Sequence, residues 1–379
     1  MKKICYVATI PAVVHAFLRG HIRAAAEKYD VTVVCNNADA HLLDGINARL
    51  ILLPIERKAS PWRDLMVLIQ LMILFRRERF DLVHSIMPKT GLLSMLAAWA
   101  AGVPNRMHIF TGQVWATKQG WKRGSLKMFD RLIVLFANQI LMDSPSQRDF
   151  LVSEGILPQG NGIVIGHGSI CGVDADQFHP DAQVREKVRR ELDVSLEQTI
   201  ILFLGRLNRD KGILDLAAAF VEIASKRTDA VLVLVGAEED ISFAYVQAIC
   251  GAYGDRLRRV SFTTNPERYM AAADIFCLPS YREGFGQVII EAGATEVPTV
   301  ATCIYGVTDA VEDRKTGLLF SAGDVAGLTQ SLLKLIDDRF LRHEMGTAAR
   351  ARALELFPSH KISEGMLALY GQLLTKRCD

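Results

Sequence analysis

The sequence predicts two α/β domains that face each other, each built on a doubly wound parallel sheet. The chain has 379 residues, 50% of them hydrophobic, and a single core stops growing beyond about 250 to 300 residues. Short β-rich runs alternate with longer helical patterns in both halves, which is typical of parallel sheets covered by helices on both faces. A stretch rich in glycine and proline, residues 158–182, separates the two series and is expected to hold the linker.

The first half begins with a β-rich run and continues as alternating strands and helices. Apolar runs predict strands at residues 4–8, 31–35, 49–53 and 80–84. Helical spacing predicts helices at residues 13–28, 61–79 and 90–101. Pro61 suits the first turn of the second helix, and Gly102 with Pro104 ends the third.

The second half repeats this order. Strands are expected at residues 199–205, 230–236, 259–263, 274–279 and 298–303, and helices at residues 212–227, 287–295, 324–338 and 340–356. We therefore expect domains at residues 1–175 and 176–357, with a last helix, about residues 358–379, packed back on the first domain. Ligands of such sheets bind at the carboxyl ends of the strands, so the active site is expected in the cleft between the domains.

Charge, cysteines and hydropathy limit the class of protein. The 44 basic and 42 acidic residues give a net charge of +2, which argues against a nucleic-acid partner. The seven cysteines form no C-x-x-C pair and are interpreted as reduced core residues of a cytosolic protein. The apolar run at residues 4–14 is interpreted as a first strand rather than a signal peptide. The run at residues 65–75 is too short to span a bilayer and is expected to form a core helix.

A cationic loop is expected where the first strand of the second half ends. Arg206 and Lys211 lie five residues apart across a turn bounded by Gly205 and Gly212. An Arg fork and a Lys point charge at the carboxyl end of a strand suit a diphosphate. Ordinary surface charges of a loop remain the alternative.

A second loop combines glycines with two carboxylates. Gly284 and Gly286 lie between an apolar strand and a helix, where backbone N–H groups and the helix dipole favour an anion. Glu283 and Glu291 would repel a phosphate, but they suit the hydroxyl groups of a sugar or a ribose. Alternatively, Glu283 caps a turn and Glu291 pairs with a helix neighbour.

These motifs resemble those of the retaining family 4 glycosyltransferases. Glu283 and Glu291 match the E-x7-E motif of that family, and Arg206 with Lys211 matches its diphosphate-binding G-R-L…K-G. The branch that extends capsule, O-antigen and lipid-linked oligosaccharides is the most similar. The resemblance implies a GT-B fold of two Rossmann-like domains and transfer of a hexose or N-acetylhexosamine, with retention, from a nucleotide sugar, expected to be UDP-linked.

The resemblance also implies roles for single residues. Arg206 and Lys211 would neutralise the diphosphate in place of a metal, so no metal and no cofactor are expected. Glu283 would contact the transferred sugar, and Glu291 would accept hydrogen bonds from the ribose. The remaining contacts, to phosphate or sugar oxygens, would come from backbone N–H groups near Phe285, Gly286 and Gln287. The Asp174–Asp176 pair falls in the linker and is not interpreted as a metal motif.

Two positions of the first domain depart from the family pattern. Many members have a glycine-rich loop after the first strand, whereas residues 9–12 contain no glycine. Many also have a His directly before the glycine that matches Gly112, where this chain has Thr111. Either the Thr111 hydroxyl takes over that role or the role is vacant. His108, three residues earlier, is expected to be a core histidine.

A basic, Trp-bearing segment at residues 110–127 is expected on the acceptor side. It carries no acidic residue, and its distinctive side chains are Trp115, Lys118, Trp121, Lys122 and Arg123. Such a mixture suits an anionic membrane interface or a polyprenyl-diphosphate-linked acceptor. The alternative is a solvated helix start with Trp anchors in the core.

The sequence thus predicts a cytoplasmic glycosyltransferase of cell-surface polysaccharide biosynthesis, with peripheral contact to the cytoplasmic face of the inner membrane. Two other functions remain open at this point. One is a nucleotide-sugar 2-epimerase, which has the same two-domain architecture and needs no acceptor. The other is a catalytically silent scaffold subunit that keeps donor binding.

Overall fold

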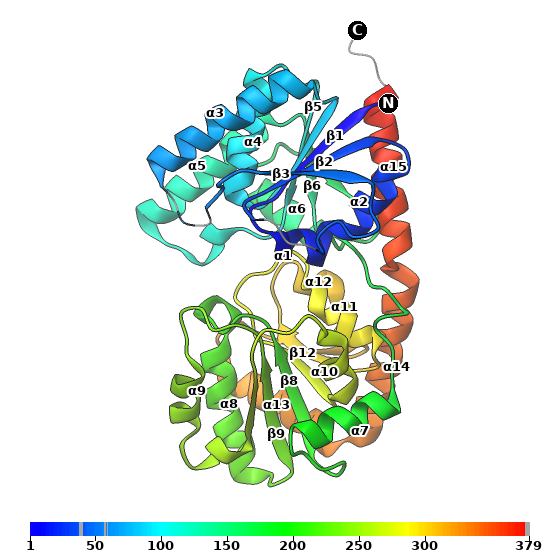
Figure 1. The fold of residues 1–379 in the computed structure, drawn as a ribbon. Helices are drawn as coiled ribbons and strands as arrows, with labels where there is room; N and C mark the ends of the chain where they lie inside the picture. The colour runs from blue at the N-terminus through cyan, green and yellow to red at the C-terminus, as the bar shows by residue number, and fades with distance from the viewer. Residues whose placement is uncertain (38–40, 57, 59, 376–379) are drawn as a thin grey trace. The chain divides into compact units, whose positions relative to one another are not determined.

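The computed structural model describes residues 1–37, 41–56, 58 and 60–375 and contains two compact units (Figure 1). The first unit comprises Met1–Gly172 and the C-terminal helix α15 (Ser359–Thr375), and the second comprises Val173–Pro358. The second unit is therefore one continuous segment, whereas the first is made of two. The two ends of the second unit lie together, because the Val173 N–H donates to the Phe357 carbonyl oxygen at 2.8 Å.

The first unit is built on a seven-stranded parallel sheet with the order β3-β2-β1-β4-β5-β6-β7. Its strands are β1 (Lys3–Val7), β2 (Asp30–Cys35), β3 (Ala48–Leu52), β4 (Leu82–Ile86), β5 (Asn105–Phe110), β6 (Gln139–Met142) and β7 (Ile163–Val164). The order of the strands reverses between β1 and β4, which defines a topological switch point.

Helices cover both faces of this sheet. They are α1 (Pro11–Val13), a π-helical turn (Val14–Leu18), α2 (Arg19–Ala26), α3 (Pro61–Glu78), α4 (Pro88–Ala100), α5 (Gly120–Phe136), α6 (Pro145–Ser153) and α15. Successive side chains of β1 point to opposite faces of the sheet. Ile4 and Tyr6 pack with α2 and α15 on one face, and Cys5 and Val7 pack with α3 and α4 on the other.

Helix α15 completes the core of the first unit. Met366, Tyr370 and Leu373 are buried in it, and the Tyr370 hydroxyl lies 2.7 Å from Nδ1 of the buried His84 on β4. Burial lowers the pKa of His84 to about 3, so its imidazole is neutral and can share a hydrogen bond with the Tyr370 hydroxyl. The C-terminal helix therefore satisfies a polar group in the middle of the N-terminal sheet.

The second unit has the same strand order in a six-stranded parallel sheet, β10-β9-β8-β11-β12-β13. Its strands are β8 (Thr199–Leu204), β9 (Ala230–Val235), β10 (Leu257–Val260), β11 (Ile275–Leu278), β12 (Thr299–Thr302) and β13 (Gly317–Phe320). The switch point lies between β8 and β11. The predicted class, with two doubly wound parallel sheets, is confirmed.

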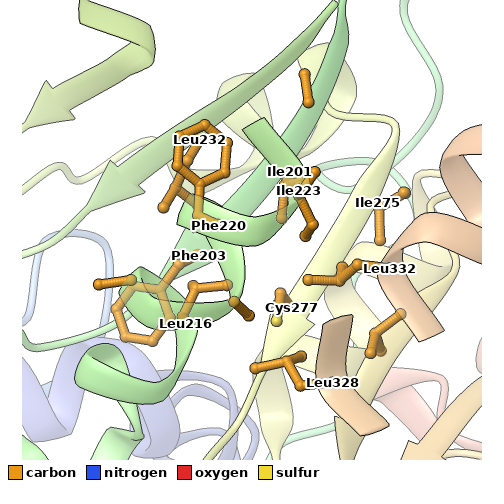
Figure 2. Packing of buried hydrophobic residues seen from close by; sticks show 14 of the residues in the cluster. Ile201, Phe203, Leu216, Phe220, Ile223, Leu232, Ile275, Cys277, Leu328 and Leu332 are labelled. Atoms are coloured by element: carbon orange, nitrogen blue, oxygen red, sulfur yellow. The ribbon is translucent and has the colours of Figure 1, made fainter. Parts of the chain in front are cut away.

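Four helices of the second unit begin at short polar side chains that cap them. Asp181, Ser242, Asp324 and Asp338 each accept from backbone N–H groups of a first turn. The helices are α7 (Ala182–Glu191), α8 (Ile213–Lys226), α9 (Phe243–Cys250), α10 (Pro266–Ala272), α11 (Gln287–Ala294), α12 (Val307–Ala310), α13 (Val325–Asp337) and α14 (Arg339–Leu356). Figure 2 shows one face of the sheet, where Ile201 and Phe203 of β8 pack with α8 and α13.

Some expectations from the sequence are corrected by the structure. The expected helix at residues 13–28 is interrupted by the π-helical turn, and β13 was not expected as a strand. Cys303 is exposed rather than part of a core, and Cys378 lies outside the described residues. The expected core helix at residues 65–75 is half exposed: Val67, Leu71 and Phe75 of α3 are buried, but its other face is open to solvent. None of the helices in the described ranges has the length and hydropathy that a bilayer span requires.

Candidate active site

The candidate donor site lies at the carboxyl edge of the second sheet, on both sides of its switch point. The loop after β8 carries Arg206 and Lys211, and the loop after β11 carries Glu283. The two loops approach each other closely at Gly212. Its φ is 68°, and a Cβ built there would lie 1.9 Å from the Pro279 carbonyl oxygen. The glycine is therefore required for the loop after β8 to lie against the loop after β11.

Lys211 and Glu283 form an ion pair across this contact. The Lys211 Nζ lies 2.5 Å from Glu283 Oε1, and the two side chains are only 23% and 13% exposed. The backbone of Lys211 is fixed too, because its N–H donates to Asn208 Oδ1 at 2.9 Å. Two residues that are 72 positions apart thus share one partly buried polar site.

Arg206 meets a carboxylate that sequence reasoning missed. Arg206 Nη1 lies 2.5 Å from both oxygens of Glu239, in the loop after β9, and Asn208 Nδ2 donates to Glu239 Oε2 at 2.6 Å. The side chains of Arg206 and Glu239 are 41% and 36% exposed. No motif marks Glu239. Glu239 could have been identified from its position, because it follows β9, the strand next to β8 in the sheet.

Two further contacts brace the loops after β8 and β11. Arg282 Nε donates to Asp210 Oδ2 at 2.8 Å, and the Tyr281 hydroxyl donates to Asp215 Oδ2 at 2.7 Å. The hydrogen bond to Asp215 raises the pKa of Tyr281 to about 12, so this phenol stays a donor at neutral pH. These contacts fix the loops relative to each other before any ligand is bound.

The glycine turn and helix α11 complete this edge. Gly286 has a φ of 80° and caps α11, which begins at Gln287. The Phe285 ring is buried and lies edge-on to Phe357, with centroids 5.1 Å apart, so only its backbone can contact a ligand. One turn into the helix, Glu291 Oε1 accepts from Gln287 Nε2 at 3.2 Å. Burial raises the pKa of Glu291 to about 7.

The candidate residues of the first unit follow β5. Thr111 and Gly112 come directly after this strand, with Thr111 partly buried and Gly112 at a φ of 101°. His108, on β5 itself, is fully buried, with Nδ1 2.9 Å from the Ser85 hydroxyl oxygen. Burial lowers its pKa to about 3. The expectation of a core histidine at this position is confirmed.

The structure places Trp115 in the core and Arg123 in an ion pair. Trp115 is 1% exposed, stacks on Phe150 and donates from Nε1 to Asp130 Oδ2 at 2.7 Å. Its ring is therefore part of the core. Arg123 lies over that ring and pairs with Glu154 at 2.7 Å, so its charge is already partnered.

The remaining candidates of that segment lie closer to the surface. Trp121 is 78% exposed at the start of α5, and Lys122, beside it, is exposed as well. Lys118 is partly buried in the turn before α5. Of the predicted acceptor residues, Trp121 and Lys122 are thus the two most open to solvent.

The chain contains two doubly wound sheets, and the switch point of the second carries a cationic loop and a carboxylate loop. This is the arrangement of the GT-B glycosyltransferases. The second unit matches the family model "Glycosyl transferases group 1" over residues 184–352, and the first matches "Glycosyl transferase 4-like domain" over residues 15–168. The chain belongs to the family 4 glycosyltransferases.

Curated relatives agree with this assignment along most of the chain. The capsular polysaccharide biosynthesis glycosyltransferase CapM of Staphylococcus aureus is 28% identical over 376 residues, 98% of this chain and 98% of that protein. The α-maltose-1-phosphate synthase of Mycolicibacterium smegmatis is 30% identical over 315 residues, which cover 77% of this chain and 79% of that protein. The UDP-Gal:α-D-GlcNAc-diphosphoundecaprenol α-1,3-galactosyltransferase of Escherichia coli is 26% identical over 327 residues, 83% of this chain and 82% of its own.

A solved structure shows the same fold. Sucrose-phosphate synthase from Thermosynechococcus elongatus superimposes with a TM-score of 0.81 at 23% identity, covering 98% of this chain and 99% of that one.

Proposed function

We propose that this glycosyltransferase moves a hexose or N-acetylhexosamine from a UDP-sugar to a polyprenyl-diphosphate-linked acceptor, with retention, in the biosynthesis of a capsule, O-antigen or similar cell-surface polysaccharide. The observation that carries the proposal is the partly buried Lys211–Glu283 pair at the switch point, with Arg206 in the same loop. The relatives support the substrate class, because one is a capsular enzyme and another transfers galactose from UDP-Gal to a diphosphoundecaprenol-linked sugar.

Arg206 and Lys211 would bind the donor diphosphate. When the bond between the sugar C1 and the phosphate oxygen breaks, negative charge collects on the leaving UDP, and two cations stabilise it where it develops. They would perform the charge neutralisation that a divalent ion provides in other enzymes, so we propose that transfer needs neither metal nor cofactor. Undiminished turnover in EDTA is the expected result.

The carboxylates would orient the sugar and the nucleoside. Glu283, held by Lys211 Nζ, would accept a hydrogen bond from a hydroxyl of the transferred sugar. Glu291 would accept from the ribose, and backbone N–H groups near Phe285, Gly286 and Gln287 would contact phosphate or sugar oxygens. The acceptor would approach from the carboxyl edge of the first sheet, where Thr111 and Gly112 lie.

The decisive experiment compares Lys211→Ala with Lys226→Ala. Lys226 lies at the end of α8 and pairs with the exposed Glu222 of the same helix, which makes it a matched control. We measure thermal shifts with UDP-, GDP- and TDP-sugars and then transfer to a polyprenyl-diphosphate-linked sugar. The proposal expects Lys211→Ala to lose about a hundredfold or more in turnover, with Lys226→Ala unaffected.

The same assay separates the two alternatives. Conversion of the UDP-sugar to its 2-epimer without any acceptor would identify an epimerase. Donor binding without turnover in the wild-type protein, over a panel of lipid-linked acceptors, would identify a silent scaffold. A Lys211→Ala variant within a few-fold of wild type would refute the role of the Lys211–Glu283 pair.

A further inference from the structure

The second unit has a cavity of about 450 Å³ at the edge of its sheet that is opposite to the donor site. It lies where β11 and β12 begin, since Asp274 and Pro298 directly precede these strands. Its other walls are the starts of α7 and α14, the end of α10 and the connection between α11 and β12. Strand β11 has four residues, which span about 13 Å. The cavity is therefore a place distinct from the loops that carry Lys211 and Glu283.

Four basic side chains line this cavity. Arg185 comes from α7, and Arg339, Arg342 and His343 come from the first turns of α14. Helix α14 has 18 residues, and no acidic residue stands in its first turn. Cations are unfavourable at the N-terminal end of a helix, because the helix dipole places a partial positive charge there. The stability of α14 does not account for these basic residues, whereas an anion bound in the cavity would.

Two of the carboxylates that line the cavity already have partners within the protein. Asp274 accepts from Arg185 Nη2 at 2.6 Å and from Nη2 of the buried Arg189 at 2.5 Å. Asp181 Oδ1 accepts from two backbone N–H groups in the first turn of α7, both at 2.9 Å. These carboxylates therefore do not neutralise the basic residues of α14.

Arg339 and Arg342 have no such partner, because neither forms an ion pair with a carboxylate among the residues that the structure describes. Arg342 Nη1 donates to two carbonyl oxygens at the end of α13, at 2.6 and 3.3 Å, which holds the guanidinium in place without neutralising it. Burial lowers the pKa of Arg342, an effect that the nearby Asp274 opposes. The like charges of Arg339 and Arg185 lower this pKa further. A bound anion would relieve their repulsion.

We propose that this cavity is a second ligand site, which binds a phosphate monoester of a sugar or of a similar polyol. Arg339 and Arg342 would hold the phosphate, because a guanidinium matches two phosphate oxygens at once. The cavity is larger than a phosphate needs, since its volume equals that of about 15 water molecules. Glu296 also lines it, 38% exposed and 3.7 Å from Arg350 Nε. Its carboxylate would repel a second phosphate but accept hydrogen bonds from hydroxyl groups.

The test measures binding of glucose 6-phosphate to the full chain by titration calorimetry, with inorganic phosphate and glucose as the two partial ligands. We expect glucose 6-phosphate to bind more tightly than either of them. Arg339→Ala should weaken this binding about tenfold or more without lowering the melting temperature, because Arg339 is exposed at an unfavourable end of its helix. The control Arg190→Ala changes an exposed arginine of α7 outside the cavity and should bind like wild type.

Two further variants distinguish this site from the donor site. Glu296→Ala should weaken binding of glucose 6-phosphate but not of inorganic phosphate, because it removes an acceptor for hydroxyl groups and leaves the cations. Lys211→Ala should bind glucose 6-phosphate like wild type whether or not the proposed function is correct, since Lys211 lies at the other edge of the sheet. Loss of binding in Lys211→Ala would overturn the proposal. So would absence of wild-type binding, equal affinity for inorganic phosphate, or an equal effect of Arg190→Ala.

Discussion

Glu239 is predicted to compete with the donor for Arg206. Its carboxylate lies 2.5 Å from the Arg206 guanidinium, and a diphosphate that binds Arg206 must displace it. Glu239→Gln keeps an oxygen that can accept from Asn208 but removes the charge. Because the two side chains are 41% and 36% exposed, the pair belongs to the exposed class, worth about 0.2 to 1 kcal/mol. UDP should therefore bind Glu239→Gln about 1.5- to 5-fold more tightly than wild type.

Titration calorimetry of UDP into both proteins measures this difference. Glu238→Gln is the matched control, since Glu238 is adjacent, 47% exposed, and lies 3.9 Å from Arg259 rather than at Arg206. The difference between wild type and Glu239→Gln should shrink at high salt, because the competing attraction is screened. Equal or weaker UDP binding by Glu239→Gln, or the same gain in Glu238→Gln, would refute the competition.

Three other predictions follow from single contacts. Gly212→Ala should lower thermal stability and weaken UDP binding, because the Cβ of the new alanine would overlap the Pro279 carbonyl oxygen. A melting temperature equal to that of wild type would contradict this prediction. UDP affinity should rise as pH passes upward through about 7, where the partly buried Glu291 ionises and becomes a pure acceptor for ribose hydroxyls, and Glu291→Gln should remove that dependence. Burial raises the pKa of Asp130 above its unfolded value, to about 6, so its ionisation removes stability as pH rises from about 4 through 6. Asp130→Asn keeps an oxygen that can accept from Trp115. It should therefore be more stable than wild type at pH 8 by up to about 3 kcal/mol, with no such gain at pH 4. Denaturant unfolding at pH 4 and at pH 8 measures the two stability differences.

The strands at the centres of the two sheets could be predicted because burial on both faces leaves a local signature. Residues 199–204 and 230–235 are almost wholly apolar, and they form central strands that pair with each other along their whole length. The Lys211–Glu283 contact had no such signature. It depends on the parallel pairing of β8 with β11, and on a close approach of Gly212 to Pro279, which is 67 positions away in the chain and absent from any local pattern.

Two features have physical causes that periodicity cannot detect. Helix α3 is apolar on both sides, so its pattern could not distinguish the face that meets the sheet from the face that meets solvent. Trp115 lies among cations in the sequence, and the pattern left open whether its ring lies at an interface or in the core. Its burial depends on Asp130, fifteen residues later, which satisfies the indole N–H within the core.

The return of α15 to the first unit sets the order in which the two units can fold during synthesis. The first unit needs Met366 and Tyr370 in its core, and these residues leave the ribosome only after all of residues 173–358. The N-terminal core therefore stays incomplete, with the face of β1 that carries Ile4 and Tyr6 covered by α2 but not by α15, while the second unit is translated and folds. The domain that is made first is finished last, and truncation of the C-terminus would damage the N-terminal unit while leaving the continuous second unit whole.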